Sequence, residues 1–330
     1  MNETPMTQPP GVQTRRFGIT VGPLQYWWSR EATWAFYADI ADSTADTVVL
    51  GEVVCSRRTE IKTEDWLALA GELAAQGKTV VLATQSLVAG EAELRTLRRL
   101  CEQDGFAVEA GDASALAVLV QLQAGMQAGR GARLPFVIGP HVNVYNRAAL
   151  QELAPLGAGR WVPPLELALD AVACVNPAQA PVQGPAGVVA TEIFAFGRMP
   201  LAFSARCFTA RHYRLKKDAC EFRCRADADG LLLSADDGQP FLALNGIQTQ
   251  SAALQCLIGE AQPMTDAGVS RVRLSPCSTG FRRALELFDG VLNAGASASA
   301  ARAELEELGL PGTLVNGYAH RRPGMQAVAA

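Results

Sequence analysis

Short apolar runs alternate with helical patterns over the first two thirds of the sequence. The strand-like runs are residues 17–21, 47–50, 79–83, 107–109 and 135–138, with a less regular one at 160–162. Because these runs are continuously apolar rather than alternating, we expect strands that are covered on both faces. Strand and helix in alternation, joined by short turns that contain glycine, predict parallel βαβ units.

The segments between these runs have the spacing of amphipathic helices. After Thr63, apolar side chains recur at 3.6-residue intervals, Thr63 can cap the first turn, and Gly77 ends the pattern before the next strand. Residues 93–103 and 146–153 repeat this scheme. The units are numerous enough to close a TIM-barrel-like (β/α) barrel, which typically takes about 250 residues.

An open, doubly wound sheet is the competing architecture, and the alternation alone does not separate the two. No glycine-rich dinucleotide fingerprint follows the first strand, because Gly22 is followed by Pro23. This makes the open nucleotide-binding fold the weaker prediction.

We expect one barrel domain over residues 17–320. Residues 1–16 are polar and predict a disordered leader rather than a signal peptide, because they lack an apolar stretch. Residues 192–224 are dense in aromatic, basic and cysteine residues and have no clean period, which predicts an irregular segment. Residues 231–244 predict a β-hairpin with an Asp-Gly turn, and residues 321–330 predict a loose tail.

Charge and hydropathy exclude two classes of partner. The chain of 330 residues has 33 acidic and 29 basic side chains, interspersed, with a net charge of −4. This distribution has no basic nucleic-acid footprint. No apolar run approaches the roughly 18–20 residues of a spanning helix. We therefore expect a cytoplasmic protein with no transmembrane segment and no nucleic-acid partner.

Three of the eight cysteines lie close together in the irregular segment, as Cys207-x12-Cys220-x3-Cys224, among many arginines and lysines. In a reducing compartment, thiols in a polar loop are typical of a thiolate-bound metal, and nearby cations favour the thiolate. The best fourth ligand is Cys55, which follows the strand 47–50. Four thiolates suit zinc and iron–sulfur clusters alike, so spacing leaves the metal open.

The other cysteines have a simpler interpretation, because a lone cysteine is usually a small buried apolar residue. We expect this of Cys101, Cys174 and Cys256, which lie in apolar helical or strand patterns. Cys277 follows a strand end and stays undecided.

Several polar residues follow predicted strands directly, at the end where barrel active sites collect. Glu52, His141 and Asn143 are candidate pocket residues on this ground. For Glu52 and Glu192, helix capping or a buried ion pair is an equally good interpretation. The sequence has no Gly-x-Ser-x-Gly elbow, no Walker loop and no His-Glu-x-x-His motif, so it predicts neither a serine hydrolase nor a P-loop enzyme.

Several motifs resemble those of a known family. Residues 192–197 (EIFAFG), followed by 204–207 (SARC), resemble the signature of the peptidase U32 family. A further set of segments resembles the branch of this family that serves oxygen-independent ubiquinone biosynthesis, namely residues 50–56, 200–211, 244–249 and 272–276. The resemblance spans residues 17–320.

The resemblance implies a TIM-barrel-like fold and a [4Fe-4S] cluster on Cys55, Cys207, Cys220 and Cys224. It also implies a heterodimer with a sister U32-family subunit that carries its own cluster. Together the two would support hydroxylation of the aromatic ring of ubiquinone precursors without O2. The substrate would be a polyprenylated phenol, and a sterol-carrier-like lipid-binding protein is a further implied partner.

The leading hypothesis is therefore an iron–sulfur subunit of an O2-independent hydroxylation system. One alternative is a non-catalytic structural or electron-transfer partner of the sister subunit. Another is a U32-type peptidase, but its relatives have a thiol where this chain has Arg198-Met199-Pro200. This departure argues against an active protease.

Overall fold

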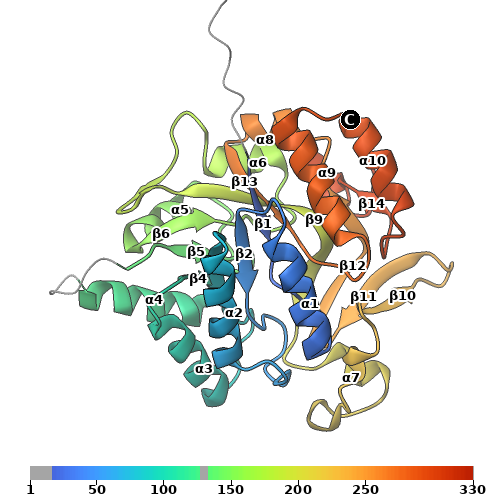
Figure 1. The fold of residues 1–330 in the computed structure, drawn as a ribbon, viewed down its shortest axis with the longest axis horizontal. Coiled ribbons are helices and arrows are strands. Elements are labelled where there is room, and N and C mark those ends of the chain that lie inside the picture. Colours follow the sequence, from blue (N-terminus) through green and yellow to red (C-terminus); the bar gives the residue numbers. More distant parts are fainter. Residues whose placement is uncertain (1–16, 127–132, 330) are drawn as a thin grey trace, which may run out of the picture.

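The computed structural model describes residues 17–126 and 133–329 (Figure 1). The predicted leader at 1–16 lies outside the described residues. Parallel pairing runs around a ring of eight strands, in which β9 pairs with β6 on one side and with β13 on the other, and β13 pairs back with β1. The ring strands are β1 (Gly18–Val21), β2 (Thr47–Leu50), β3 (Thr79–Ala83), β4 (Ala107–Ala110), β5 (Phe136–Ile138), β6 (Ala158–Trp161), β9 (Ala190–Phe203) and β13 (Val269–Leu274). The closed TIM-barrel-like fold is thus confirmed, and the open sheet is wrong.

Helices cover the outside of the ring (Figure 1). They are α1 (Arg30–Ala41), α2 (Thr63–Ala75), α3 (Glu91–Glu102), α4 (Ala113–Met126), α5 (Arg147–Leu153), α6 (Leu169–Val175), α8 (Ala261–Asp266), α9 (Phe281–Ala294) and α10 (Ala298–Glu307). Helix α2 buries the apolar stripe that its spacing predicted. Thr63 is its first residue rather than its cap: the N-cap is Lys62, whose backbone N–H donates to Asp65 at 2.9 Å. This carboxylate takes the part of a capping side chain.

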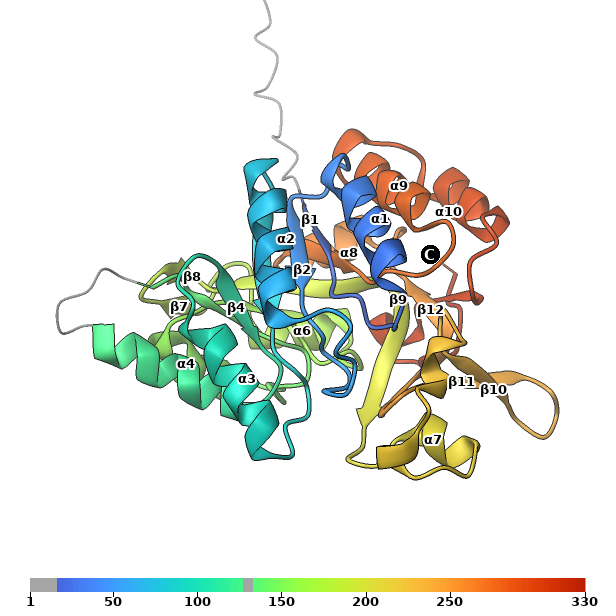
Figure 2. The ribbon, with the colours of Figure 1, turned by 60° about the horizontal axis from the view of Figure 1, so that its bottom comes forward.

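The segment predicted as irregular from residue 192 begins instead as the long strand β9. Its residues 191–200 are all buried, but they include the charged Glu192 and Arg198, which interrupt the apolar run that marks the other barrel strands. Beyond the barrel, β9 pairs antiparallel with β12 (Gln248–Cys256), which also pairs with β14 (Leu314–Val315). Figure 2 shows β9 running out of the barrel toward the short helix α7 (Phe208–His212).

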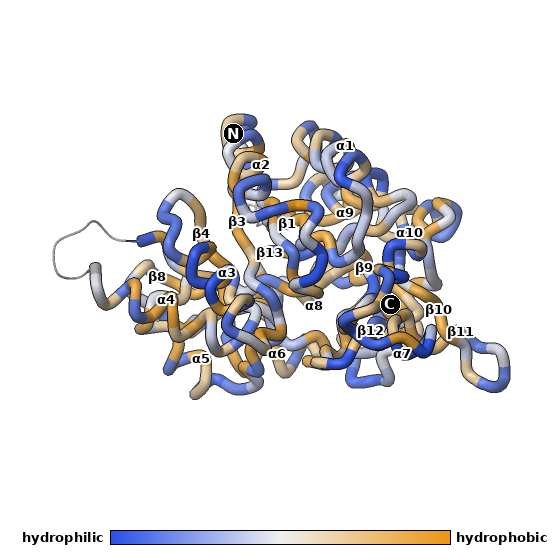
Figure 3. Tube along the Cα trace, turned by 90° about the horizontal axis from the view of Figure 1, so that it is seen from below, coloured by the Kyte–Doolittle hydropathy of each residue, from blue (hydrophilic) through white to orange (hydrophobic). Residues whose placement is uncertain are grey.

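The predicted β-hairpin is confirmed as β10 (Leu231–Ser234) and β11 (Pro240–Asn245), antiparallel to each other, with β11 continuing onto β12. Its tip, which carries Asp236 and Asp237, is hydrophilic and projects from the molecule (Figure 3).

Near the C-terminus, the residues predicted as a loose tail make specific hydrogen bonds. The Val328 N–H donates to Asn316 Oδ1 at 2.7 Å, and the Asn316 N–H donates to the carbonyl of Gln326 at 3.2 Å.

A charged network lies inside the barrel. Arg273 on β13 donates from Nε to Glu192 Oε1 at 2.6 Å and from Nη1 to Glu109 Oε1 at 2.9 Å. Glu192 Oε2 also accepts from Arg160 Nη1 at 2.9 Å and from the Thr20 hydroxyl at 3.0 Å. Glu192 is therefore a buried ion-pair residue, the plainer of the two interpretations that its position allowed.

Within the described residues, no helix has both the length and the apolar content that a bilayer crossing requires.

Candidate metal centre

The fold brings Cys55, Cys207, Cys220 and Cys224 to one place beside the carboxyl end of β2. Cys207 belongs to an apolar cluster against which Cys55 and Cys220 pack. The charges of Cys55 and Cys220 raise the pKa of the Cys207 thiol, and the charges of Cys207 and Cys220 raise that of Cys224. The charge of Cys224 in turn raises the pKa of Cys55. Each of the four thiols thus lies within range of another's charge, although they come from two separate segments of the chain.

The turn after β2 determines where Cys55 lies. Gly51 has φ +136°, and a Cβ on it would come within 2.6 Å of the Ala83 carbonyl oxygen on the neighbouring strand end. Only glycine fits this close approach without strain. Glu52 then accepts from the backbone N–H groups of Val54 and Cys55, both at 2.9 Å. This predicted pocket residue therefore shapes the loop that presents Cys55.

The second segment is held by its own short turns. Cys207 is the N-cap of α7, and its Sγ accepts from the Ala210 N–H at 3.3 Å. Cys220 ends one 3-10 turn, and Cys224 lies in the next, Arg223–Arg225. Cys207 thus lies at the start of a short helix, and Cys220 and Cys224 lie in 3-10 turns, so the segment can wrap around a centre.

Burial raises the pKa of the Cys55, Cys207 and Cys224 thiols. Arg58 opposes this rise at two of them: its charge lowers the pKa of Cys55, and its charge and a hydrogen bond lower that of Cys224. Thiols must lose their protons to bind a metal, so a nearby buried cation favours the ligating form.

Arg58 is a residue of this candidate site that sequence reasoning missed. It is 4% exposed and donates from Nη1 to the Gln25 carbonyl at 2.7 Å and from Nη2 to Asn245 Oδ1 at 2.6 Å. Its Nη1 also lies 3.7 Å from Glu52 Oε1. The sequence signal was only a pair of arginines after Cys55, which reads equally well as solvated charge.

By residue type, the four cysteines fit a thiolate-bound centre, because four sulfurs are the ligands of structural zinc and of iron–sulfur clusters. In the part of the chain that the structure describes, no group of three or more His, Cys, Asp or Glu is placed to hold a metal ion. One zinc ion would need sulfurs about 3.8 Å apart, given Zn–S bonds of about 2.3 Å. A cluster keeps its thiolates farther apart, because iron and sulfide lie between them.

His141 and Asn143 lie in different surroundings. The His141 ring packs edge-on against Phe203, with centroids 4.7 Å apart, and burial together with the charge of Arg273 lowers its pKa to about 4. It lines a cavity of about 30 Å³ at the carboxyl end of the barrel, which has room for a water molecule. Asn143 is exposed and is not among the residues that line this cavity.

Of the four remaining cysteines, Cys174 differs from its prediction. Cys101 and Cys256 are buried as expected. Cys174 is exposed, so the expectation of a core residue is wrong: α6 buries Leu169, Val172 and Val175, and position 174 falls on the outer face. Cys277 is buried, and its Sγ donates to the Thr279 carbonyl at 3.2 Å.

Fold and site together define a closed parallel (β/α) barrel with a candidate thiolate centre beside the carboxyl end of its second strand. The chain belongs to peptidase family U32, which matches residues 33–308 and so includes all four candidate ligands.

Solved structures with some similarity to this chain have low sequence identity to it. The U32 peptidase Mk0906 is 13% identical with a TM-score of 0.40, covering 83% of this chain and 97% of that one. The spore cortex-lytic enzyme SleL of Bacillus megaterium is 10% identical with a TM-score of 0.40, covering 87% and 78%. SleL of Bacillus cereus is 11% identical with a TM-score of 0.38, covering 85% and 75%. At these values the similarities carry no statement about the function of this chain.

Proposed function

We propose that this chain is the V component (UbiV) of oxygen-independent ubiquinone biosynthesis, a cytoplasmic iron–sulfur subunit that works as a heterodimer with a sister U32-family subunit. The pair would support hydroxylation of the ring of a polyprenylated phenol, with oxygen from a source other than O2. The observation that carries the proposal is the convergence of Cys55 with Cys207, Cys220 and Cys224 around the buried cation Arg58.

In this proposal the four cysteines hold a [4Fe-4S] cluster, which when bound supplies one-electron redox chemistry. Four thiolate ligands leave no open position on iron, which favours electron transfer or a structural role over direct activation of substrate. The residues of the chain have separate tasks. Glu52 holds the Cys55 loop through two N–H groups, and Arg58 offsets the negative charge of the thiolates.

In this proposal the chain is not a peptidase, because the segment compared with the peptidase thiol is built into the sheet. At the position where peptidase relatives carry a thiol, Arg198, Met199 and Pro200 lie buried in β9. Arg198 donates to the carbonyl of Ser251 at 2.9 Å, and the Met199 N–H donates to the Ser251 hydroxyl at 2.9 Å. These bonds join β9 to β12, so the segment has a structural task and presents no nucleophile.

A lipid-binding partner follows from the substrate. A polyprenyl tail exposed to water carries a large apolar surface, which is costly to hydrate. We therefore include a sterol-carrier-like protein in the proposal, as the partner that delivers the phenol.

The test is anaerobic purification of the chain with and without its sister subunit, followed by visible absorption and quantification of iron, sulfide and zinc. We expect iron and sulfide in equal amounts, near four of each per chain, as in a [4Fe-4S] cluster. Zinc without sulfide would overturn the proposal.

Substitutions of cysteine test the ligand set. Cys207→Ala is expected to abolish the centre, whereas Cys101→Ala and Cys256→Ala, which change buried thiols elsewhere in the fold, are expected to retain it. Equal loss of iron from both sets would contradict the assignment. Cluster-retaining variants of His141 and Asn143 that still support anaerobic quinone synthesis would remove those residues from the site.

A further inference from the structure

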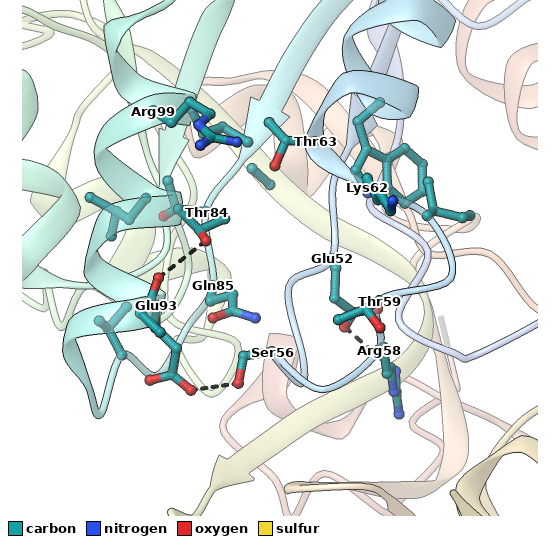
Figure 4. Close-up of a pocket in the computed structure, with 18 of the residues that line it drawn as sticks. Glu52, Ser56, Arg58, Thr59, Lys62, Thr63, Thr84, Gln85, Glu93 and Arg99 are labelled. Atoms are coloured by element: carbon teal, nitrogen blue, oxygen red, sulfur yellow. Dashed lines mark hydrogen bonds and ion pairs between the residues drawn. The ribbon is translucent and has the colours of Figure 1, made fainter.

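A cavity of about 630 Å³ lies outside the ring, between α2, α3 and the loops that follow β2 and β3. Figure 4 shows its polar side chains arranged around an open centre, with Glu93 and Arg99 on one side and Glu52 and Lys62 on the other. Its volume is within the range of small-molecule sites, about 300–1,000 Å³. It shares Glu52, Ser56 and Arg58 with the loop that carries Cys55.

The cavity has an apolar lining on the side of α3, where Val88, Leu97 and Leu100 form a wall. Ile61 and the ring of Trp66 add apolar surface from the side of α2. Leu97 and Leu100 come from the buried face of α3, so this wall is continuous with the core. A hydrocarbon or aromatic body placed against it would be removed from water, which is favourable in proportion to the apolar area covered.

The polar group that faces the centre of this cavity is the amide of Gln85, whereas Trp66 lines the cavity with its ring. Trp66 is 6% exposed, and its Nε1 has no hydrogen-bond partner among the described residues. That nitrogen is itself shut off from solvent, so the Trp66 ring offers the cavity apolar surface and no donor. The amide of Gln85 lies close to Ser56 and faces Glu52 across the open centre (Figure 4).

Two side-chain bridges tie the cavity's borders together. Arg99 on α3 pairs with Glu64 on α2 at 3.1 Å, and the Ser56 hydroxyl donates to Glu93 at 2.5 Å. Between them α3 presents Ala92 and Thr96, both exposed and both lining the cavity. The cavity is therefore open to solvent at the α3 side, which would let a long tail extend outward.

We infer that this cavity binds an amphipathic small molecule, with its hydroxyl-bearing head beside Gln85 and its hydrocarbon body along the Leu97–Leu100 wall. A phenol with a prenyl tail is such a molecule, so the choice of ligand rests on the proposed function. The head would then lie next to the Cys55 loop, because Ser56 is both the neighbour of that cysteine and a lining residue.

The test uses geranylphenol, a phenol with a two-isoprene tail, titrated calorimetrically into the anaerobically purified heterodimer. Ala92→Trp and Thr96→Trp each place an indole in the cavity from an exposed position, so neither disturbs the core. We expect each to weaken binding roughly tenfold or more. Ala74→Trp on α2 is the matched control, because Ala74 is also exposed on a neighbouring helix but does not line the cavity.

A second comparison tests the polar end. Wild-type protein is expected to prefer geranylphenol over its methyl ether, which cannot donate a hydrogen bond, and Gln85→Leu is expected to lose this preference. An undiminished preference in Gln85→Leu would overturn the placement of the head group.

Iron and sulfide are measured in the same samples, so the two proposals fail separately. Cluster-containing protein that does not bind geranylphenol, or that binds it equally well in the Ala92→Trp and Thr96→Trp variants, overturns the cavity assignment alone. Binding that these variants weaken, in protein that holds zinc and no sulfide, supports the cavity and overturns the cluster.

Discussion

Replacement of Arg273 by methionine tests the charged network inside the barrel. Methionine keeps an unbranched side chain of similar length but removes the charge and all the donors. Glu109 would lose the two hydrogen bonds that it receives from Arg273, whereas Glu192 would keep Arg160 and Thr20. The variant therefore leaves one buried carboxylate without a cation and a second with less compensation.

The expected loss in the free energy of unfolding is that of a broken buried ion pair. Removal of one partner of a buried ion pair destabilises a protein by about 3–5 kcal/mol. Burial by itself would raise the pKa of Glu192, but Arg273, Arg160 and Arg271 together lower it to about 2 from its ordinary 4.5. By linkage, that difference corresponds to about 3 kcal/mol for the three arginines together, net of the burial penalty. It shows that the network as a whole is worth a few kcal/mol, and the cost of removing Arg273 alone is taken from the broken ion pair.

The pKa of Glu192 also determines the pH dependence. Because its pKa in the folded state lies below its unfolded value, the stabilisation is complete above about pH 4.5 and is lost as the pH falls toward about 2. Removal of Arg273 takes away part of that stabilisation. The difference between wild type and variant is therefore expected to shrink as the pH is lowered through this window.

The assay is thermal unfolding followed by circular dichroism, on protein purified anaerobically. An unfolding entropy of about 2.1 cal/mol/K per residue gives about 0.7 kcal/mol/K for 330 residues, so a loss of 3–5 kcal/mol lowers Tm by about 4–7 °C at pH 7. Arg283→Met is the matched control, because Arg283 also contacts two carboxylates, Glu286 and Glu304, but at the surface, where water screens the charges. A loss in Arg273→Met no larger than in this control would refute the reasoning, as would a difference that does not shrink at low pH.

Three further predictions concern the site and its surroundings. Gly51→Ala is expected to lower the free energy of unfolding by about 1–3 kcal/mol and to lower the iron content, because its Cβ would meet the Ala83 carbonyl oxygen. Gly71→Ala, the control in open space on α2, is expected to stabilise the protein slightly. Tm and iron content are measured for both variants. The His141 ring is expected to stay neutral down to about pH 4, and an NMR titration midpoint near 6.5 would contradict that. Iodoacetamide at pH 8 is expected to label the exposed Cys174 first, because burial raises the pKa of Cys101, Cys256 and Cys277; earlier labelling of those three in peptide mass spectra would contradict it.

The barrel strands could be predicted because a fully buried parallel strand is a short, continuously apolar run. The observed bounds of β2 and β3 are the predicted residues 47–50 and 79–83. Strand β9 departs from this pattern: its buried run includes Glu192 and Arg198, whose hydrogen-bond partners lie far away in the sequence. Polar residues buried in this way break the apolar run and cannot be recognised without their partners.

The cysteines show a similar division. Spacing indicated that Cys207, Cys220 and Cys224 belong together, because they are close along the chain. The prediction for Cys174 failed because α6 is short and apolar on more than one side, so composition did not show which face is buried. Which face of a helix meets the core is decided by packing.

By itself, the sequence determined the parallel strand–helix repeat and the thiol-rich segment, because both are local patterns of residue type. The tertiary structure alone decided that the repeat closes, through pairing of β13 with β1, and that Arg58 lies buried beside Cys55 and Cys224. It alone also formed the cavity between α2 and α3. Closure, burial and convergence depend on contacts between residues distant in sequence, and no local pattern specifies those contacts.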